Sequence, residues 1–342
     1  MDENLNPETE QKPVCATCGN PEILEGYPIK LCNDCRNKFI QFPIPVWVKL
    51  FGAGIAVILL VSAIWLPQNL GAAIALSRAE NAEKNRDYLT EQRELEKAKK
   101  SVPNSIDILG HLAVASFYNF NLGTTDSTIN ALQKRNFEDT ALLHNINYII
   151  DELKSFYPSE AFDTAFTKYK KTLVPDTALE RYIRKNPNDM YALYTLASSS
   201  ADKDEYQKSD TLLSRILTIQ PDFILALNMK CMTKRELNQF DSSAYYCDRL
   251  LYINHQSTYA MSAKARTLVK SGKNKEGLEL ALKVSDLNKN DPYNLTTLAI
   301  AYHFNKNYKE RDRLIDLAEK DSVSRYYMKY AKEIFSGKIK YQ

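Results

Sequence analysis

Four segments of the chain carry one pattern: NPNDMYALYTLAS at residues 186–198, QPDFILALNMKCM at 220–232, NHQSTYAMSAKAR at 254–266 and NKNDPYNLTTLAI at 288–300. They align without gaps, and the same period separates each from the one before it. A small side chain recurs at one place in each segment, at Ala197, Cys231, Ala265 and Ala299. Small side chains at fixed intervals are needed where two antiparallel helices approach closely, because a larger one would force them apart. The pattern predicts a stack of helix pairs.

The stretch that follows each segment predicts the second helix of the pair. A second set of small residues recurs at Ser209, Ser243 and Gly277, and Arg311 interrupts it in the last unit. Apolar residues follow at steps of three and four, which is typical of one buried helix face.

The 34-residue period, the small-residue positions and a closing proline resemble the tetratricopeptide repeat family over residues 187–322. Lys230 and Lys264 depart from it, because the family has an apolar residue there. The resemblance implies a mostly α-helical fold, a solenoid of four antiparallel helix pairs, closed by a capping helix and tail at 323–342. The same frame predicts one further unit near residues 72–105, and the remainder of 72–186 is expected to be helical but irregular.

The resemblance also implies where a ligand binds, since stacked helix pairs expose a concave face lined by the first helices. Tyrosine suits such a face because it offers a large contact area at low entropic cost. A protein or peptide ligand is therefore expected in the groove, and packing of the tyrosines between adjacent repeats is the alternative. The groove residues expected to contact it are Tyr191, Tyr194, Asn228, Met232, Arg235, Tyr259, Arg266, Tyr293 and His303.

Upstream of the repeats lies the apolar segment VWVKLFGAGIAVILLVSAIWL, residues 46–66, and no charged residue occurs from 50 to 77. A helix of this length spans about 30 Å, the thickness of the hydrocarbon core of a bilayer. Trp47 and Trp65 suit the two headgroup boundaries, and Pro67 is expected to end the helix. A single transmembrane helix is predicted. A buried helix and a cleaved signal peptide are the alternatives, and the long segment before it disfavours the second.

The strongest chemical signal is a pair of Cys-x2-Cys knuckles, formed by Cys15 with Cys18 and by Cys32 with Cys35. Four thiolates can close a tetrahedron around Zn²⁺ and leave no position open for a substrate, so a structural zinc site is predicted. The pattern resembles the zinc-ribbon family over residues 13–38, after a disordered segment at 1–12. A domain this small needs the metal to fold. Iron or dithiol redox chemistry, or no metal, are the alternatives.

Basic residues are slightly enriched before the apolar segment relative to after it, which favours a cytoplasmic amino terminus. The repeats would then be extracytoplasmic, in the periplasm if the source is Gram-negative. A formal net charge of +3 gives no reason to expect a nucleic-acid partner. The sequence does not specify an oligomeric state.

The sequence contains no catalytic motif, because its histidines at 111, 144, 255 and 303 are scattered and no glycine-rich phosphate loop occurs. Cys231 and Cys247 are expected to be core thiols, with a disulfide as the alternative outside the cytoplasm. We therefore expect a non-catalytic, membrane-anchored scaffold or adaptor. The alternative is a transmembrane signalling protein whose cytoplasmic zinc ribbon contacts nucleic acid or a regulator.

Overall fold

The computed structural model describes residues 12–40, 44–169 and 173–342, excluding the side chains of 64–69. The disorder expected at residues 1–12 falls, except for Lys12, outside the described part of the chain. The chain divides into two compact units, Met1–Pro67 and Gln68–Gln342. Across the described ranges all regular secondary structure is helical.

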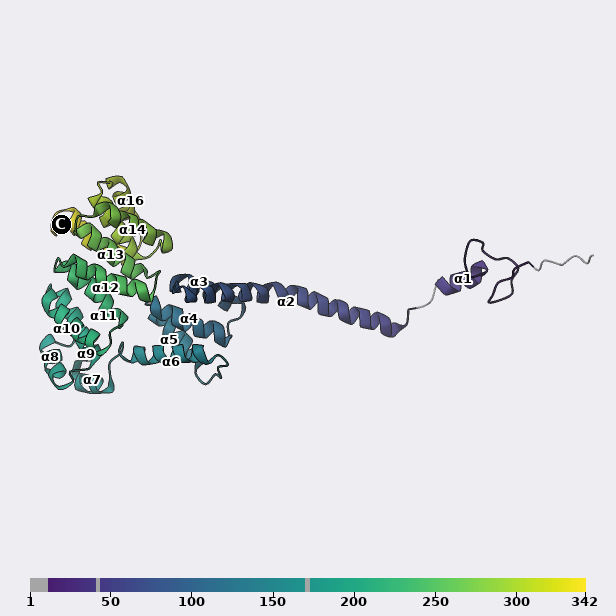
Figure 1. Ribbon diagram of the computed structural model, residues 1–342, viewed down its shortest axis with the longest axis horizontal. Coiled ribbons are helices and arrows are strands. Elements are labelled where there is room, and N and C mark those ends of the chain that lie inside the picture. Colours follow the sequence, from purple (N-terminus) through teal and green to yellow (C-terminus); the bar gives the residue numbers. More distant parts are fainter. Residues whose placement is uncertain (1–11, 41–43, 170–172) are drawn as a thin grey trace, which may run out of the picture. The chain divides into compact units, whose positions relative to one another are not determined.

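Four helix pairs repeat along the second unit (Figure 1). The first helices are α9 (Met190–Asp202), α11 (Ile224–Glu236), α13 (Thr258–Lys270) and α15 (Pro292–Phe304). The second helices are α10 (Tyr206–Ile219), α12 (Phe240–Ile253), α14 (Asn274–Leu287) and α16 (Tyr308–Ala318). Each helix begins one repeat period after its counterpart in the preceding pair. The predicted fold class, a mostly α-helical solenoid of antiparallel helix pairs, is confirmed.

The ends of the helices repeat with the same spacing. The residue that precedes each first helix caps it in three of the four pairs, where Asp189, Ser257 and Asp291 accept a hydrogen bond from an amide one turn later. The turn between the two helices of each pair contains one residue in the left-handed region, at Asp204, Asn238, Gly272 and Lys306. Only Gly272 adopts this conformation without the steric cost of a Cβ atom.

The small residues lie where the helices of a pair approach most closely. A Cβ atom on Gly277 would lie 2.6 Å from Cγ2 of Val269 and 3.0 Å from the carbonyl oxygen of Ala265. Ser243 is fully buried, and its hydroxyl donates to the carbonyl oxygen of Cys231 at 2.6 Å. The reason given for the small-residue positions, close approach of two helices, therefore holds in the structure.

Upstream helices continue the repeat before it is interrupted. The helices are α2 (Val46–Lys84), α3 (Tyr88–Ser101), α4 (Ile106–Tyr118), α5 (Leu122–Leu132) and α6 (Thr140–Lys154). The α2–α3 and α4–α5 turns have left-handed residues one repeat period apart, at Arg86 and Phe120. Because α6 also begins one period after α4, the frame extends through α6, beyond the single unit expected from the sequence.

The frame breaks after α6, where α7 (Glu160–Ala165), the 3-10 helix η1 (Thr167–Tyr169) and α8 (Asp176–Lys185) are short. The helix α2 also runs through position 67, so the expectation that Pro67 ends it is wrong. A proline removes one backbone hydrogen bond, and a long helix can continue past that loss.

The upstream pairs pack back onto the middle of the array. In the turn after α2, the carbonyl oxygen of Arg86 accepts from the amide of His255 at 2.9 Å, and its guanidinium donates to the carbonyl oxygen of Tyr252 at 2.8 Å. Deeper in the same interface, the ring of Phe156 lies between those of Phe117 and Phe223, at centroid distances of 5.5 and 5.1 Å. One hydrophobic core therefore runs from α4 to α13.

The array ends in α17 (Ser322–Phe335), which buries Met328, Ala331 and Ile334. The tail then turns back, and the buried Tyr341 stacks on Phe304 with ring centroids 5.5 Å apart. These residues close the last repeat.

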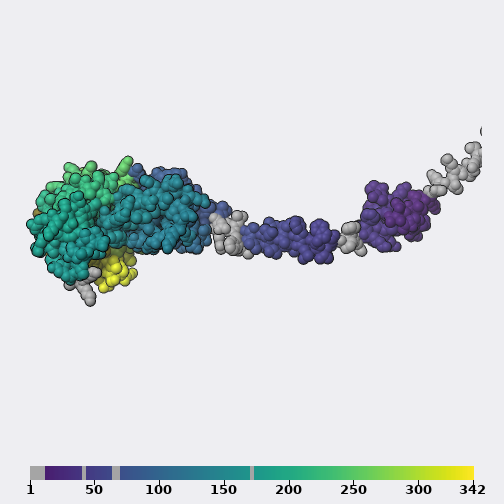
Figure 2. Space-filling model, turned by 90° about the horizontal axis from the view of Figure 1, so that it is seen from below, coloured from purple at the N-terminus to yellow at the C-terminus, as the bar shows by residue number. Residues whose placement is uncertain are grey.

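The first unit contains α1 (Asn33–Ile40) and the apolar part of α2. The segment Val46–Ala63 has a mean hydropathy of 2.2, and none of it is buried. Figure 2 draws this segment in space-filling form, with its side chains exposed. In the described ranges this is the one helical segment long and apolar enough to cross a membrane.

Candidate functional site

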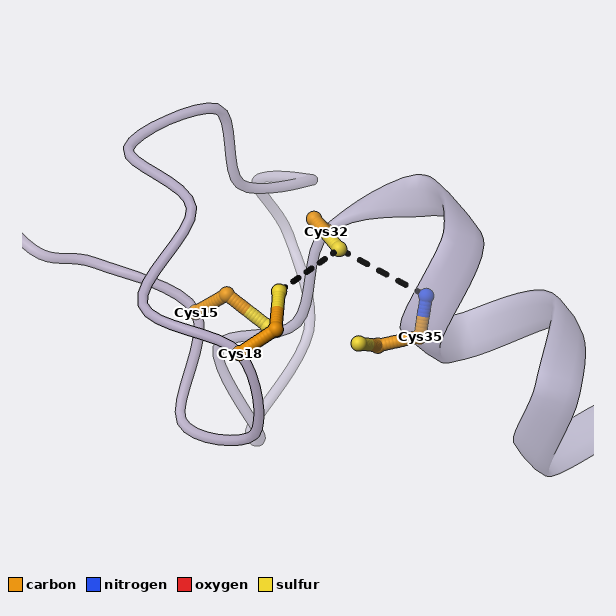
Figure 3. Close-up of side chains that lie close together, drawn as sticks. All are labelled: Cys15, Cys18, Cys32 and Cys35. Carbon is orange, nitrogen blue, oxygen red and sulfur yellow. Dashed lines mark hydrogen bonds between the residues drawn. The ribbon is translucent and has the colours of Figure 1, made fainter.

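The four cysteines of the two knuckles come together in the first unit (Figure 3). Cys15 and Cys18 lie on a loop, while Cys32 precedes α1 and Cys35 lies in its first turn. All four sulfur atoms lie within 4.8 Å of one another, and those of Cys18 and Cys32 are 3.6 Å apart. Gly19 has a φ of 73° and lets the loop turn back, with its amide donating to the carbonyl oxygen of Cys15.

This geometry fits a tetrahedral zinc ion. A Zn–S bond of about 2.3 Å places the sulfur atoms of a tetrahedron about 3.8 Å apart, close to the separation of Cys18 and Cys32. Backbone amides, that of Cys32 first, lower the pKa of Cys15 to about 6. The neighbouring Cys18 and Cys32 sulfurs raise the pKa of Cys35 to about 12, because charge on four clustered sulfurs is self-repelling. A divalent cation at their centre would remove that repulsion.

The backbone around the cluster differs from a β-ribbon. Residues 12–40 contain no strand, and the second knuckle leads directly into α1. One hairpin-like hydrogen bond joins the amide of Leu24 to the carbonyl oxygen of Leu31 at 3.0 Å. The described part of this segment is therefore a pair of cysteine-containing loops with a helix.

The predicted groove tyrosines form part of an aromatic row. Tyr259 lies between Phe120 and Tyr293, at ring-centroid distances of 5.5 and 5.9 Å, and Tyr293 continues to Tyr327 at 6.4 Å. The guanidinium carbon of Arg266 lies 3.9 Å from the centroid of the Tyr293 ring. Apart from Tyr327, these side chains are partly or fully buried, so they pack between repeats.

The other two predicted tyrosines lie nearer the amino end of the array. Tyr191 packs edge-on against Phe162 of α7 at 4.9 Å, and Tyr194 packs against Phe223 at 6.4 Å. Asn228 and Met232 of α11 are half-buried. The structure therefore does not bring all the predicted residues into one open groove.

Two predicted groove residues are largely withdrawn from the open face, Arg235 by burial and His303 by contact with α17. Arg235 is only 3% exposed and donates to the carboxylate of Glu236 at 2.8 Å. The imidazole of His303 stacks on Phe335 of α17 at 4.6 Å, and burial, together with Arg311, lowers its pKa. At 3% exposure, Arg235 is not accessible to a ligand carboxylate in this structure.

An open cleft of about 390 Å³ remains at the carboxy-terminal end of the aromatic row. Its walls come from α13, α15 and α17, and it is lined by Arg266, Tyr293, Tyr326, Tyr327, Lys329, Tyr330 and Glu333. Sequence reasoning missed the part from α17, which it treated only as a cap. The signal was present, because Tyr327 and Tyr330 occupy the repeat positions of the predicted groove residues Tyr191 and Tyr194, four periods later.

Lys230, which departs from the family pattern, is held by a buried ionic contact. Its ammonium lies 2.6 Å from Oδ1 of Asp210 and 2.6 Å from the hydroxyl of Ser214, and its side chain is 2% exposed. At the position where the family pattern has an apolar residue, this chain therefore has a buried lysine paired with an aspartate. Cys231 and Cys247 are buried free thiols, and burial raises the pKa of Cys231.

No family model and no curated protein matches the chain. Among solved structures, a tetratricopeptide repeat protein from Parabacteroides merdae aligns at 13% identity and a TM-score of 0.40, over 76% of this chain and 98% of that one. Yeast Tom70 aligns at 11% identity and a TM-score of 0.35, over 75% and 62% of the two chains. The TPR2AB domain of yeast Sti1, in a pHSP90 complex, aligns at 13% and 0.26, over 71% and 96%. The fold assignment rests on the repeat frame of the chain itself.

Proposed function

We propose that this chain is a membrane-anchored, non-catalytic scaffold that binds a protein segment in the aromatic cleft between α13, α15 and α17. The observation that carries this proposal is the exposed aromatic surface at that place. Tyr326 is 76% exposed and Tyr327 40%, although both adjoin a packed aromatic row. Large aromatic side chains left in contact with water beside a concavity are typical of interaction sites.

The polar groups of the cleft suit a peptide more than a small apolar ligand. Arg266 stacks on Tyr293 and donates to Thr297 at 2.8 Å, so its guanidinium is fixed in position. Lys329 and Glu333 on α17 add one charge of each sign at the rim. Fixed donors beside aromatic faces bind backbone carbonyls and apolar side chains together, which is the chemistry of peptide recognition.

We place the ligand at this end of the row because its tyrosines are exposed there, whereas the hollow of about 350 Å³ beside Phe120 and Tyr259 is lined mainly by polar side chains. Elsewhere the chain itself covers predicted groove positions. Phe120 covers Tyr259, Phe162 covers Tyr191, and the tail residue Tyr341 lies over the last turn of α13. The binding residues we propose are therefore a subset of those expected from the family frame, extended by α17.

The apolar segment Val46–Ala63 provides the anchor, as a single membrane-spanning helix. Its fully exposed apolar surface favours this, because a soluble protein rarely leaves so large an apolar patch in water. The cysteine cluster holds a structural Zn²⁺ on the cytoplasmic side, and the repeats lie on the other side. Reporters of each compartment fused at both ends of the chain test this topology, and a cytoplasmic signal from both ends would contradict it.

The binding proposal is tested with the full chain in lipid nanodiscs and a random peptide library displayed on phage. Peptides selected by the wild type should bind at least about tenfold more weakly to Tyr326→Ala and Tyr327→Ala chains, since each removes a contact worth about 1.4 kcal/mol or more. Tyr245→Ala is the matched control, because Tyr245 is also exposed, at 58%, but lies on the second helix α12. Equal binding by all three variants would refute the cleft assignment.

A further inference from the structure

Three ionisable side chains converge away from the cleft, between the first helices of the second unit. Glu83 lies in the last turn of α2, Glu91 in the first turn of α3 and His111 in α4. One oxygen of each carboxylate and one nitrogen of the imidazole all lie within 4.8 Å of one another. Nδ1 of His111 is 2.9 Å from Oε2 of Glu83 and 3.9 Å from Oε1 of Glu91.

Glu91 is the feature of this cluster that ordinary packing does not explain. Its side chain is completely buried, and neither carboxylate oxygen has a hydrogen-bond partner among the described residues. Burial, with a smaller contribution from Glu83, raises the pKa of Glu91 to about 9. The negative charge of a carboxylate in such a place must be neutralised by a proton or by a cation.

The contact between His111 and Glu83 favours a shared cation. Although Nδ1 and Oε2 are close, Nδ1 has no partner with hydrogen-bond geometry among the described residues. A nitrogen and an oxygen that lie close together without forming a hydrogen bond are expected when both coordinate the same cation. With metal–ligand bonds of about 2.1 Å, neighbouring ligand atoms lie roughly 3.0–3.4 Å apart, and the observed 2.9 and 3.9 Å bracket that range.

We propose that Glu83, Glu91 and His111 bind one divalent transition-metal ion through two carboxylate oxygens and one imidazole nitrogen. Two carboxylates balance the charge of the ion, and the oxygen-rich donor set suits Mn²⁺, Fe²⁺ or Zn²⁺. The side chains of His111 and Glu83 are 14% and 22% exposed, so water can complete the coordination from that side.

The ion would join three helices at one point. The helices α2, α3 and α4 already share an apolar cluster that includes Ala79, Leu95 and Leu112, and such a shell holds ligands in fixed orientations. Glu83 is in the last turn of the helix whose earlier part is the apolar segment. The metal therefore fastens the end of α2 to α3 and α4.

The test uses the full chain in nanodiscs, stripped of metal with a chelator and titrated with Mn²⁺. Electron paramagnetic resonance measures bound Mn²⁺ as loss of the free-ion signal. Thiolates prefer softer ions, so the four-cysteine cluster does not compete for Mn²⁺. We expect one bound Mn²⁺ per wild-type chain, and affinity lower by at least about tenfold in Glu91→Gln and in His111→Phe.

Matched controls are Glu94→Gln on the same helix as Glu91, and His144→Phe, an exposed histidine on α6. Both should bind Mn²⁺ as the wild type does. Mn²⁺ should also raise the thermal midpoint of the wild type and of both controls, but not of Glu91→Gln, whose fold circular dichroism verifies without metal. Equal Mn²⁺ binding by wild type, Glu91→Gln and His111→Phe would overturn the proposal. So would a wild-type chain that takes up no Mn²⁺ and no Zn²⁺ beyond the cysteine site at millimolar metal.

Discussion

Replacing Asp210 with alanine should destabilise the repeat array strongly, because it leaves the ammonium of Lys230 buried without its counter-charge. Lys230 donates to Oδ1 of Asp210 at 2.6 Å and to its carbonyl oxygen at 3.0 Å. The side chains of the pair are 2% and 11% exposed. Ser214 and the carbonyl oxygen would remain as neutral acceptors, which cannot balance a full positive charge.

The structure provides the magnitude and an internal control. Breaking a buried ion pair by removing one partner costs about 3–5 kcal/mol, and the two remaining neutral acceptors favour the lower end. Lys264 occupies the position of Lys230 in the next repeat and pairs with Asp248 at 2.5 Å, but these side chains are 28% and 53% exposed. Loss of such an exposed pair costs about 0–1 kcal/mol. Asp210→Ala should therefore cost several times more than Asp248→Ala.

The assay is thermal unfolding of the full chain in nanodiscs, followed by circular dichroism at 222 nm. A domain of this size changes its midpoint by roughly 2–4 °C per kcal/mol, so Asp210→Ala should lower it by roughly 6–12 °C. Asp248→Ala should lower it by less than about 4 °C. Replacing the whole pair, as Lys230→Met with Asp210→Leu, should restore most of the loss. Similar midpoints for the two alanine variants would refute the reasoning.

Further predictions concern packing, pH and metal. Gly277→Val should lower the free energy of unfolding by about 1–3 kcal/mol, because a Cβ atom at this position would lie 2.6 Å from Val269 on the neighbouring helix. A Cβ atom at Gly123 would have no atom within 4 Å, so Gly123→Ala should be neutral or slightly stabilising in the same thermal unfolding assay. Burial lowers the pKa of Lys230 in the folded chain. At pH values between this lowered pKa and the ordinary pKa of lysine, the unfolded chain therefore binds more protons than the folded chain. The stability of the wild type relative to Lys230→Met should therefore rise with pH through this interval, and a flat difference would contradict the burial of its charge. Cys32→Ser should lower the zinc bound per chain by one ion, measured by native mass spectrometry, and expose residues 12–40 to protease; unchanged zinc content would exclude this cluster as a zinc site.

The repeat register could be predicted from the sequence because it depends on the size of single side chains. A large residue at the position of Ala265 or Gly277 would hold the two helices of those pairs apart, so the restriction appears as small residues that recur with the repeat period, with Arg311 as the exception in the last pair. The cysteine cluster was predictable for a similar reason, since two knuckles contain all four cysteines within a short segment. The apolar segment could be predicted as well, because it is one continuous run of residues.

The conformations of the turns could not be predicted from the residue types within them. A left-handed residue occurs in the turn of every regular pair, yet Asp204, Asn238 and Lys306 are not glycine. Packing of the two helices on either side imposes that conformation and outweighs its local cost. No residue type in the sequence therefore marks the two upstream turns at Arg86 and Phe120.

The sequence by itself determined the helix pairs, their spacing and the two cysteine knuckles, because each depends on residues within one unit or one short segment. Only the tertiary structure decided which parts of the inner face stay open. Phe120, Phe162 and Tyr341 come from distant parts of the chain to cover positions that the repeat pattern alone leaves accessible. The same folding brings Glu91 and His111 together from different helices. Such contacts depend on how whole elements stack, and no periodicity along the chain encodes them.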